Sequence, residues 1–497
     1  MQKENSSTQG EKETETRIQS RPTGFRMFAD AQLDDIHLSS LEILRRTGVR
    51  VHEAESLDLL RQAGCSVTDE NLVRFPAAVI ENAIDAAPSR IVLCNRTGEP
   101  RVILESNRSF FGTGSDLPNT IDLESGERRP SLLADVKNAA LLADSLPNLD
   151  FVMSMALPSD LDMKTSDRHS FLAMTENTVK PLVFTAWDEA GLADIIAMSE
   201  TIVGGPDNLQ LSPFLLAYLE PTSPLQHTEV VLRKVLMMAD HGLPFVYAPG
   251  PVDGGTSPVT PAGSLALANA EVISGNAIAQ LRRKGTPVVW GSGSGPLDMK
   301  TMVATYSSPE FMLHCMAMAE LAHYYYKKPV WGFAGCSDSK LPDIQAGIES
   351  ALWIYSMALS GSNLIHDAGY IESGMTASLE MMVVADEIIS FVRRLIGGIE
   401  FTPETLALDV INKVGPGGSF MNTMHTRQNF RKVWYPRVLD RHNHHGWIQA
   451  GQPTAIKTAR DLAKDAILNH KPTPIAPGIS ETLNSIIAEA DKRAGLI

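Results

Sequence analysis

Residues 328–370 decide the fold. They read KPVWGFAGCSDSKLPDIQAG (328–347), then a helical stretch, then GSNLIHDAGY (361–370). The apolar runs 329–334 and 363–365 have the length and composition of buried parallel strands, and polar residues and Gly follow each run at once. In a barrel of alternating strands and helices, the carboxyl ends of the strands form one rim, where the chemistry takes place. This segment therefore predicts one wall of an active site.

From residue 109 onward, short apolar runs alternate with longer stretches that carry apolar residues every three or four positions. This alternation is typical of βα units, and several of the runs begin with Pro, which the first position of a strand tolerates. Eight such units with short connections predict a (β/α)8 TIM barrel, and a doubly wound open sheet is the alternative. The expected strands are 109–114, 150–156, 181–187, 213–220, 244–250, 287–293, 329–335 and 363–369.

The rest of the chain divides around this barrel, which we place at 109–400. Residues 1–23 are polar and of mixed charge, and they predict a disordered tail. Residues 24–108 predict an α+β extension, in which the strand-like RIVLCNR covers one end of the barrel. NTIDLESGERRPS (119–131) predicts a small hairpin, and 401–497 predict a helical C-terminal extension.

Composition excludes several classes of protein. The 497 residues carry a formal charge of −15 and no Lys/Arg-rich stripe, which argues against binding to nucleic acid. The apolar runs are strand-sized or amphipathic, so we expect no association with a membrane through a spanning helix. Four cysteines without C-x-x-C spacing suit a reducing compartment, and we expect a cytoplasmic protein.

Neither a bound metal nor a bound nucleotide is expected. RHNHHGW (441–447) clusters three His, with His425 nearby, but no H-E-x-x-H and no cysteine pair completes a ligand set. The Gly-rich stretches 254–264 and 291–296 lack the spacing of the nucleotide-binding motifs. Cys336 ends a predicted strand, but no base partner for a thiolate is evident in the sequence.

Aromatic residues gather at the predicted strand ends, in a chain that is only 6% aromatic. Cation–π attraction and a nearby carboxylate stabilise a quaternary ammonium, which cannot donate hydrogen bonds. On the residues alone, packing of the barrel layers is the simpler explanation of the same aromatic rings. His366 and Asp367 form a candidate acid–base or hydrogen-bonding pair, and a structural His–Asp contact remains the alternative.

Three long segments resemble the trimethylamine methyltransferase superfamily of corrinoid-dependent enzymes. They are GCSDSKLPDIQAG (335–347), NLIHDAGYIESGMTASLEMMVVADEII (363–389) and VGPGGSFMNTMHTRQNFR (414–431). The resemblance runs from about residue 24 to about residue 451. It implies a TIM barrel that passes a methyl group from a methylated amine to the Co(I) centre of a separate corrinoid protein. The chain itself is then expected to hold no tightly bound cofactor, because the corrinoid (cobalamin) belongs to the partner.

The sequence contains only ordinary amino acids, so it resembles the non-pyrrolysine branch, which includes glycine betaine methyltransferases and relatives acting on proline betaine and carnitine. A quaternary ammonium already carries a full charge and leaves as a neutral tertiary amine. Catalysis by positioning and electrostatics is then sufficient.

With this implication, the aromatic rim is expected to form a cage around the ammonium group. The expected cage is Phe111, Trp187, Tyr218, Trp290, Phe333 and Tyr370, with negative charge from Glu220 or Asp338. The expected catalytic residues are His366, Asp338 and Lys340, of which His366 and Lys340 are candidate donors to a substrate carboxylate. Ser337, Asp338, Asp343 and Gln345 are expected to bind the substrate or the lower rim of the corrin, and Asp367 is expected to bind the substrate.

The leading hypothesis is a methyltransferase that takes a methyl group from glycine betaine to a corrinoid protein. The same reaction on proline betaine, carnitine or another betaine is the first alternative. A betaine-binding barrel without turnover and a metal-dependent barrel hydrolase are further alternatives. A homo-oligomer is compatible with the sequence.

Overall fold

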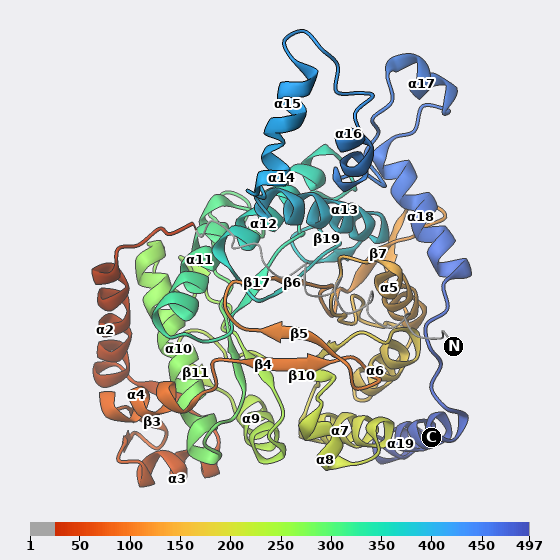
Figure 1. Cartoon of the computed structure of the whole chain (residues 1–497). Coiled ribbons are helices and arrows are strands. Elements are labelled where there is room, and N and C mark those ends of the chain that lie inside the picture. The colour runs from red at the N-terminus through yellow and green to blue at the C-terminus, as the bar shows by residue number, and fades with distance from the viewer. Residues whose placement is uncertain (1–24, 497) are drawn as a thin grey trace, which may run out of the picture.

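The core of the molecule is a closed ring of eight parallel segments in the computed structural model, which describes residues 25–496 (Figure 1). Ladder hydrogen bonds and single bridges join neighbours all the way round. The ring confirms the predicted (β/α)8 barrel and excludes an open sheet. In ring order the segments are β6 (Phe110–Phe111), 151–152, β9 (Leu182–Phe184), β10 (Leu215–Leu219), β12 (Phe245–Tyr247), β14 (Val288–Trp290), β17 (Trp331–Phe333) and β18 (Leu364–His366).

One helix or helical pair follows each segment and packs on the outside of the ring. Local sequence sets the helix ends: Asp188 and Asp343 cap amino termini with their side chains, while Gly204 and Gly361 take the left-handed conformation at carboxyl termini. The helices are α5 (Leu133–Ser145), α6 (Ser166–Asn177), α7 (Glu189–Val203), α8 (Pro206–Leu211), α9 (Glu229–His241), α10 (Pro261–Arg282), α11 (Pro309–Glu320) with a π-helical turn (Leu321–Tyr325), α12 (Ile344–Ser360) and α13 (Leu379–Ile396).

Large rings fill the barrel interior because glycines on neighbouring strands leave room for them. Phe151 and Trp331 lie with ring centroids 6.1 Å apart. A Cβ on Gly112 would lie 2.6 Å from the carbonyl oxygen and the ring of Phe151, and one on Gly291 would lie 2.6 Å from the Cβ of Trp331. The interior is therefore a packed core and not a pore.

The residues before the barrel form the predicted α+β extension. Its hairpin β4–β5 lies across the amino end of the barrel, where the Cys94 N–H donates to the carbonyl of Pro213 at 2.8 Å. The predicted covering role of RIVLCNR is thus confirmed. The elements are α2 (Asp30–Arg46), β1 (Val49–Val51), α3 (Ala54–Gln62), β2 (Ser66–Thr68), β3 (Leu72–Arg74), α4 (Ala77–Ala86), β4 (Ile91–Cys94) and β5 (Pro100–Leu104). The predicted tail, 1–23, lies outside the described residues.

Short strands in the βα loops build the opposite end of the barrel. The hairpin predicted at 119–131 is present as antiparallel β7 and β8, and β20 extends it into a four-stranded sheet with β19. The loop strands are β7 (Asn119–Ile121), β8 (Arg128–Pro130), β11 (Gln226–His227), β13 (Val252–Asp253), β15 (Gly295–Asp298), β16 (Val303–Ala304), β19 (Tyr370–Ile371) and β20 (Thr376–Ala377).

Helices dominate the chain after α13. The pair α18 and α19 returns to the barrel, where α18 packs on α13 and α5 and α19 packs on α7. The shorter helices α14–α17 project from the body as an arm (Figure 1). Within residues 25–496 no helix combines the length and apolarity that crossing a bilayer requires. These helices are α14 (Pro403–Leu406), α15 (Leu408–Val414), α16 (Met424–Asn429) with a 3-10 turn (Phe430–Lys432), α17 (His444–Gln449), α18 (Ala455–Asn469) and α19 (Pro477–Arg493).

Replacing Gly112 with Ala tests how the ring closes. The new Cβ meets the backbone of Phe151, so the two segments must separate, and we expect a loss of about 1–3 kcal/mol of stability. Thermal denaturation measures it as a lower melting temperature. Gly347→Ala in α12 is the control, because its Cβ meets nothing within 4 Å and Ala is expected to stabilise a helix by about 0.5–1 kcal/mol. Equal melting of Gly112→Ala and the unaltered protein would contradict this account.

Candidate active site

A cavity of about 390 Å³ opens at the carboxyl ends of the barrel strands. A second cavity of about 190 Å³ adjoins it and shares Tyr218, Glu220, Tyr306 and Phe333. Carboxyl ends of barrel strands are the usual place for an active site in this fold. The main cavity is lined by Ser115, Asp116, Met153, Thr185, Ala186, Trp187, Tyr218, Glu220, Val231, Lys234, Tyr306, Phe333, His366, Asp367, Tyr370 and Gly374.

Aromatic rings from two other strands surround His366 at the floor of this cavity. Its imidazole centroid lies 4.2 Å from that of Trp331, 4.4 Å from Phe333 and 6.2 Å from Tyr218. Phe333, Trp331 and His366 come from the neighbouring strands β17 and β18, and the Tyr218 ring reaches them from β10 on the opposite side of the ring. Ring faces of this kind attract cations and exclude water.

His366 and Asp367 form a neutral pair. Nδ1 of His366 donates to the carbonyl of Gly332 at 3.0 Å, so its Nε2, 3.4 Å from Oδ1 of Asp367, is left without a proton. Burial lowers the pKa of His366 to about 3 and raises the pKa of Asp367 well above its usual value. Oδ2 of Asp367 has no hydrogen-bond partner, and the residue holds a φ of +83°. A buried carboxyl oxygen without a partner in a cavity wall indicates a ligand-binding position.

Glu220 adds a second carboxyl group at the end of β10. Burial raises its pKa to about 7, against a smaller lowering by the Tyr218 hydroxyl, which lies 3.4 Å from Oε2. The group therefore changes charge near neutral pH, and a cation in the cavity favours its ionised form.

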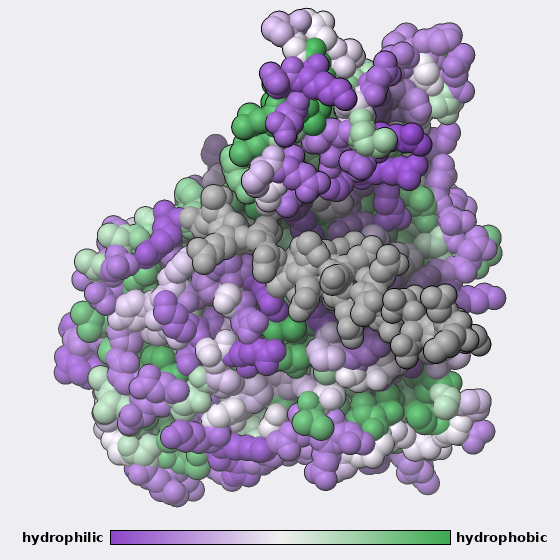
Figure 2. All heavy atoms as spheres, viewed as in Figure 1, coloured by the Kyte–Doolittle hydropathy of each residue, from purple (hydrophilic) through white to green (hydrophobic). Residues whose placement is uncertain are grey.

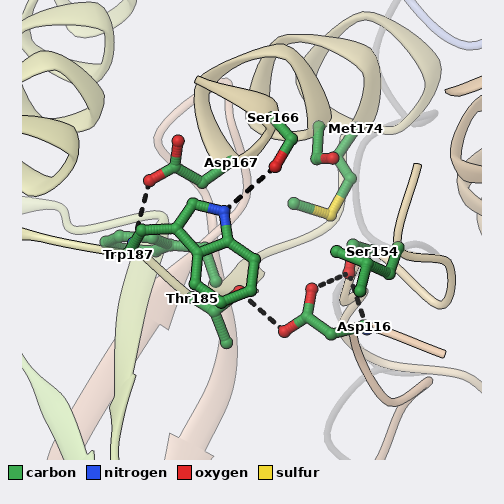
Figure 3. A pocket seen from close by; sticks show the side chains of 10 residues that line it. Asp116, Ser154, Ser166, Asp167, Met174, Thr185 and Trp187 are labelled. Atoms are coloured by element: carbon green, nitrogen blue, oxygen red, sulfur yellow. Dashed lines mark hydrogen bonds between the residues drawn. The ribbon is translucent and has the colours of Figure 1, made fainter. Parts of the chain in front are cut away.

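Asp116 and Trp187 form the wall near β9 (Figure 3). Thr185 and Ser154 donate to the Asp116 carboxyl at 2.8 and 3.2 Å, and burial raises the pKa of that carboxyl. The Trp187 indole N–H donates to Ser166 at 3.0 Å, and its backbone N–H donates to Asp167 at 2.9 Å. These bonds to α6 fix a ring that is still 40% exposed at the rim.

Lys234 is the ammonium group of the cavity lining. It extends from α9 and donates to the carbonyl of Ala186 at 2.7 Å. Burial lowers its pKa, while the charges of Asp167 and Asp188 oppose that shift. Since an ammonium has three N–H donors, one bond leaves donors for a ligand.

The sequence-predicted residues divide into two groups. The residues of the first group line the same cavity, and their functional roles stay predictions. The second group lies outside the cavity, contrary to the expectation that its members line it. In the cavity are Trp187, Tyr218, Glu220, Phe333, His366, Asp367 and Tyr370. Outside it are Phe111, Trp290, Ser337, Asp338, Lys340 and Gln345.

Phe111 and Trp290 face the outer helices because side chains alternate along a strand. The guanidinium of Arg393 on α13 lies 5.6 Å from the Phe111 ring, and Trp290 packs 5.1 Å from Tyr326. Their neighbours Gly112 and Gly291 take the inward positions, against Phe151 and Trp331.

Asp338 connects loops and does not face the cavity. Its carboxylate accepts from the N–H of Tyr306 at 2.8 Å, the N–H of Ser307 at 3.1 Å and the hydroxyl of Ser373 at 2.7 Å. Because Tyr306 lines both cavities, Asp338 is a positioning residue for that ring.

The other three residues belong to the start of α12. Ser337 donates to Glu349 at 2.6 Å and is fully buried, and Gln345 donates to the same carboxylate at 2.9 Å. Lys340 is exposed, and its ammonium donates to the carbonyl of Asp338 at 2.8 Å. The polar run after β17 predicts a rim, whereas most of it turns the chain into α12.

Sequence reasoning missed Tyr306 and Lys234. Tyr306 lies in the loop between β16 and α11, in the βα connection of the β14 strand, which is where this fold carries its functional residues. Lys234 lies inside an ordinary amphipathic helix, and no sequence signal distinguishes it. Among residues 25–496, no three His, Cys, Asp or Glu side chains gather as a metal site, and the histidines of 441–447 are no exception.

Comparison with known proteins assigns the chain to a family. A model of the trimethylamine methyltransferase family (MTTB) matches residues 1–495. The chain belongs to the trimethylamine methyltransferase family. It is 32% identical to trimethylamine methyltransferase MttB of Desulfitobacterium hafniense (strain DSM 10664 / DCB-2), over 95% of each chain. It is 30% identical to the glycine betaine methyltransferase of Desulfitobacterium hafniense (strain Y51), over 95% of this chain and 98% of that one.

A solved structure supports the fold of this family member. The hydroxylamine complex of MtmB is 12% identical and superposes with a TM-score of 0.50, over 93% of this chain and 98% of that one. The likeness extends beyond the barrel to the flanking extensions, since it covers nearly the whole chain.

Asp338→Asn tests the positioning of Tyr306. An amide offers only one acceptor oxygen, so one backbone N–H of the 306–307 loop then faces the NH2 group, which is itself a donor. We therefore expect the free energy of unfolding to fall by about 1–3 kcal/mol. Thermal denaturation measures the loss. Asp409→Asn in the exposed part of α15 is the matched control and should melt like the unaltered protein. Identical melting temperatures of both variants would show that the hydrogen bonds of Asp338 to the 306–307 loop contribute nothing to stability.

Proposed function

We propose that this methyltransferase-family member transfers a methyl group from glycine betaine to the Co(I) centre of a separate corrinoid protein. One observation carries the proposal. The cavity places Phe333, His366 and Asp367, at the ends of β17 and β18, opposite the β9 end, where the buried ammonium of Lys234 is bonded. This polarity matches a zwitterion with a quaternary ammonium at one end and a carboxylate at the other.

The two sides follow from the order of the ring. The Lys234 ammonium is bonded at the end of β9, the third segment, while Phe333 belongs to β17, the seventh. In a ring of eight, the third and seventh segments face each other across the axis. A small zwitterion that spans the barrel mouth therefore reaches both.

The aromatic side suits the ammonium end. Phe333 and His366 present ring faces there, and Asp367 supplies a carboxyl group that becomes ionised when a fixed positive charge enters. Tyr218 and Glu220, at the end of β10, add a ring and a second such carboxyl group from the opposite strand. None of these interactions needs a hydrogen on the ligand nitrogen. Such a wall holds a methylated ammonium by charge and shape alone.

The Lys234 side favours betaines over simple methylamines. The relatives do not decide between them, because the trimethylamine and glycine betaine enzymes share 32% and 30% identity with this chain. Trimethylamine has no anionic group for Lys234 to bind. A betaine carboxylate instead gives that ammonium a charge-assisted partner.

The cavity is too small to enclose a corrinoid, which could approach it only at the open mouth. A cavity of about 390 Å³ accepts a small amine and not a corrin macrocycle, so we propose that the chain holds no corrinoid itself. A reduced corrinoid carried by a partner supplies the nucleophile that takes the methyl group. The side chains of this chain desolvate the amine and orient one methyl group towards the open mouth.

A transfer assay tests the proposal. The purified protein is mixed with a reduced corrinoid protein or free Co(I)-cobalamin and with glycine betaine, proline betaine, carnitine, trimethylamine or tetramethylammonium. We expect loss of the Co(I) absorbance with glycine betaine. In Lys234→Met the KM for glycine betaine should rise by roughly 10- to 100-fold, because one charge-assisted hydrogen bond is lost, while binding of tetramethylammonium should change little.

Three outcomes would contradict parts of this proposal. Transfer from proline betaine or carnitine alone would replace the substrate within the same class, and transfer from trimethylamine alone would remove the role of Lys234. Saturable binding of betaine in a calorimetric titration without any transfer would indicate a binding barrel.

The pH dependence of binding tests Glu220. Its pKa in the empty cavity is about 7, and a permanent cation favours the ionised form, so affinity should be full above pH 7. Below pH 7 the ligand must displace a proton, and affinity should fall by up to about tenfold for each pH unit. Titration with tetramethylammonium measures this, since the ligand itself does not titrate. Glu220→Gln should bind more weakly and lose the dependence near pH 7; an unchanged profile would exclude Glu220 from the cation site.

A further inference from the structure

A third, much smaller cavity lies between the Asp116–Trp187 wall and α6 (Figure 3). Its volume of about 10 Å³ suits one occupant of the size of a water molecule. Six of its ten lining side chains end in oxygen atoms, and the hydrogen bonds of these oxygens indicate what the cavity can hold. The six are Asp116, Ser154, Ser166, Asp167, Ser170 and Thr185.

Three of the four hydroxyl groups donate their proton to other acceptors. Thr185 and Ser154 donate to the Asp116 carboxyl at 2.8 and 3.2 Å, and Ser166 donates to the carbonyl of Met163 at 3.3 Å. A hydroxyl whose proton is used offers only lone pairs, and an ionised carboxylate has no proton to donate. The lining is therefore made mainly of acceptors. A water molecule can serve two acceptors with its two hydrogens, whereas a cation can use every lone pair that reaches it.

Ser170 carries the fourth hydroxyl group. This hydroxyl makes no hydrogen bond to any residue that the structure describes, although the residue is only 7% exposed. Buried polar groups nearly always have a partner, and each exception requires an explanation. Because Ser170 lines the cavity, the missing partner of its hydroxyl is expected inside the cavity.

The lining carries the charge of one unpaired carboxylate. Asp167 is paired with the guanidinium of Arg168 at 2.9 Å, whereas Asp116 forms no ion pair within residues 25–496. Hydrophilic residues make up much of the surface coloured in Figure 2, but water and salt screen the charges there. An unpaired carboxylate in the interior is costly, and a bound cation offsets that cost.

We infer that this cavity binds one monovalent cation, Na⁺ or K⁺. Carboxylate and hydroxyl oxygens are hard ligands, which alkali cations share with Ca²⁺ and Mg²⁺. A single unpaired carboxylate balances one positive charge and leaves a divalent ion uncompensated. Within the described part of the chain, no three His, Cys, Asp or Glu side chains gather, as a transition metal would require.

A bound cation would also change the Lys234 end of the main cavity. Thr185, which donates to Asp116, precedes Ala186, whose carbonyl accepts from Lys234. On the proposed function, the betaine carboxylate binds at Lys234, where an uncompensated Asp116 carboxylate repels it. The cation removes that repulsion and favours betaine binding. This consequence rests on the proposed function, whereas the cation site itself does not.

The melting temperature of the full-length protein tests the site without any substrate. Protein dialysed into Tris chloride, free of Na⁺ and K⁺, is titrated with NaCl, KCl or LiCl at constant ionic strength. We expect Na⁺ or K⁺ to raise the melting temperature along a single-site saturation curve, by roughly 2–5 °C at a hundredfold excess over the Kd. The salt with the lower Kd identifies the ion, and LiCl controls for non-specific effects of salt.

Two variants assign the response to this cavity. Asp116→Asn removes the unpaired charge and should abolish the rise, and Ser170→Ala removes one ligand and should increase the Kd by roughly tenfold. Ser199→Ala on α7 is the matched control. Its buried hydroxyl donates to the carbonyl of Ile195 at 2.7 Å and does not line the cavity, so this variant should keep the full rise.

Three results would overturn the inference. Equal melting temperatures in all three salts would show that the cavity holds water. A rise that persists in Asp116→Asn would place the ion elsewhere. An unchanged Kd in Ser170→Ala would do the same, and this variant decides the question if Asp116→Asn does not fold. A cation response in a protein that transfers no methyl group would leave the site standing and remove the proposed function.

Discussion

The site depends on carboxyl groups that the barrel removes from water without a counter-charge. Asp367 and Glu220 lie among aromatic rings, and the pKa of each carboxyl rises because the ionised form is poorly solvated there. Asp367 also keeps one oxygen without a partner and a backbone conformation that non-glycine residues rarely adopt. Such an arrangement costs stability in the empty protein. A ligand with a fixed positive charge offsets that cost on binding, which links the energetics of the fold to its ligand.

Much of the remaining structure holds this wall in place. Asp338 fixes the 306–307 loop through two backbone bonds, and the hydroxyl of Tyr370 donates to the carbonyl of Ser115 at the end of the neighbouring strand β6. Gly114 leaves the space that Asp367 and Tyr370 occupy, because a Cβ there would lie 2.4 Å from each of their terminal oxygens. The residues that touch the cavity are therefore few, and the residues that keep it open are spread over several loops.

The sequence predicted the barrel well and its inner surface only in part. Apolar runs alternating with helical periods identified all eight segments of the barrel, because both patterns are set by local burial. Which side of a strand faces inward is a different matter, since these strands are buried on both faces and their residues are apolar on both. Trp290 and Trp331 thus look alike in sequence, although one packs on the helices and the other fills the core. Lys234 reaches the cavity only through the packing of α9 on the barrel, which no local pattern records.

The packed layer of side chains beneath the cavity closes the barrel at its amino end. Phe151 and Trp331 fill the interior, Tyr218 lies against Trp331 at 5.4 Å, and the hairpin β4–β5 lies across the amino end. Within residues 25–496 these side chains close the core beneath the cavity, so we expect a small molecule to enter and leave by the mouth. On the proposed reaction, the partner protein presents its corrin at that same opening. The order of events is then compulsory: the amine must enter before the partner docks, and the demethylated product must wait until the partner has left.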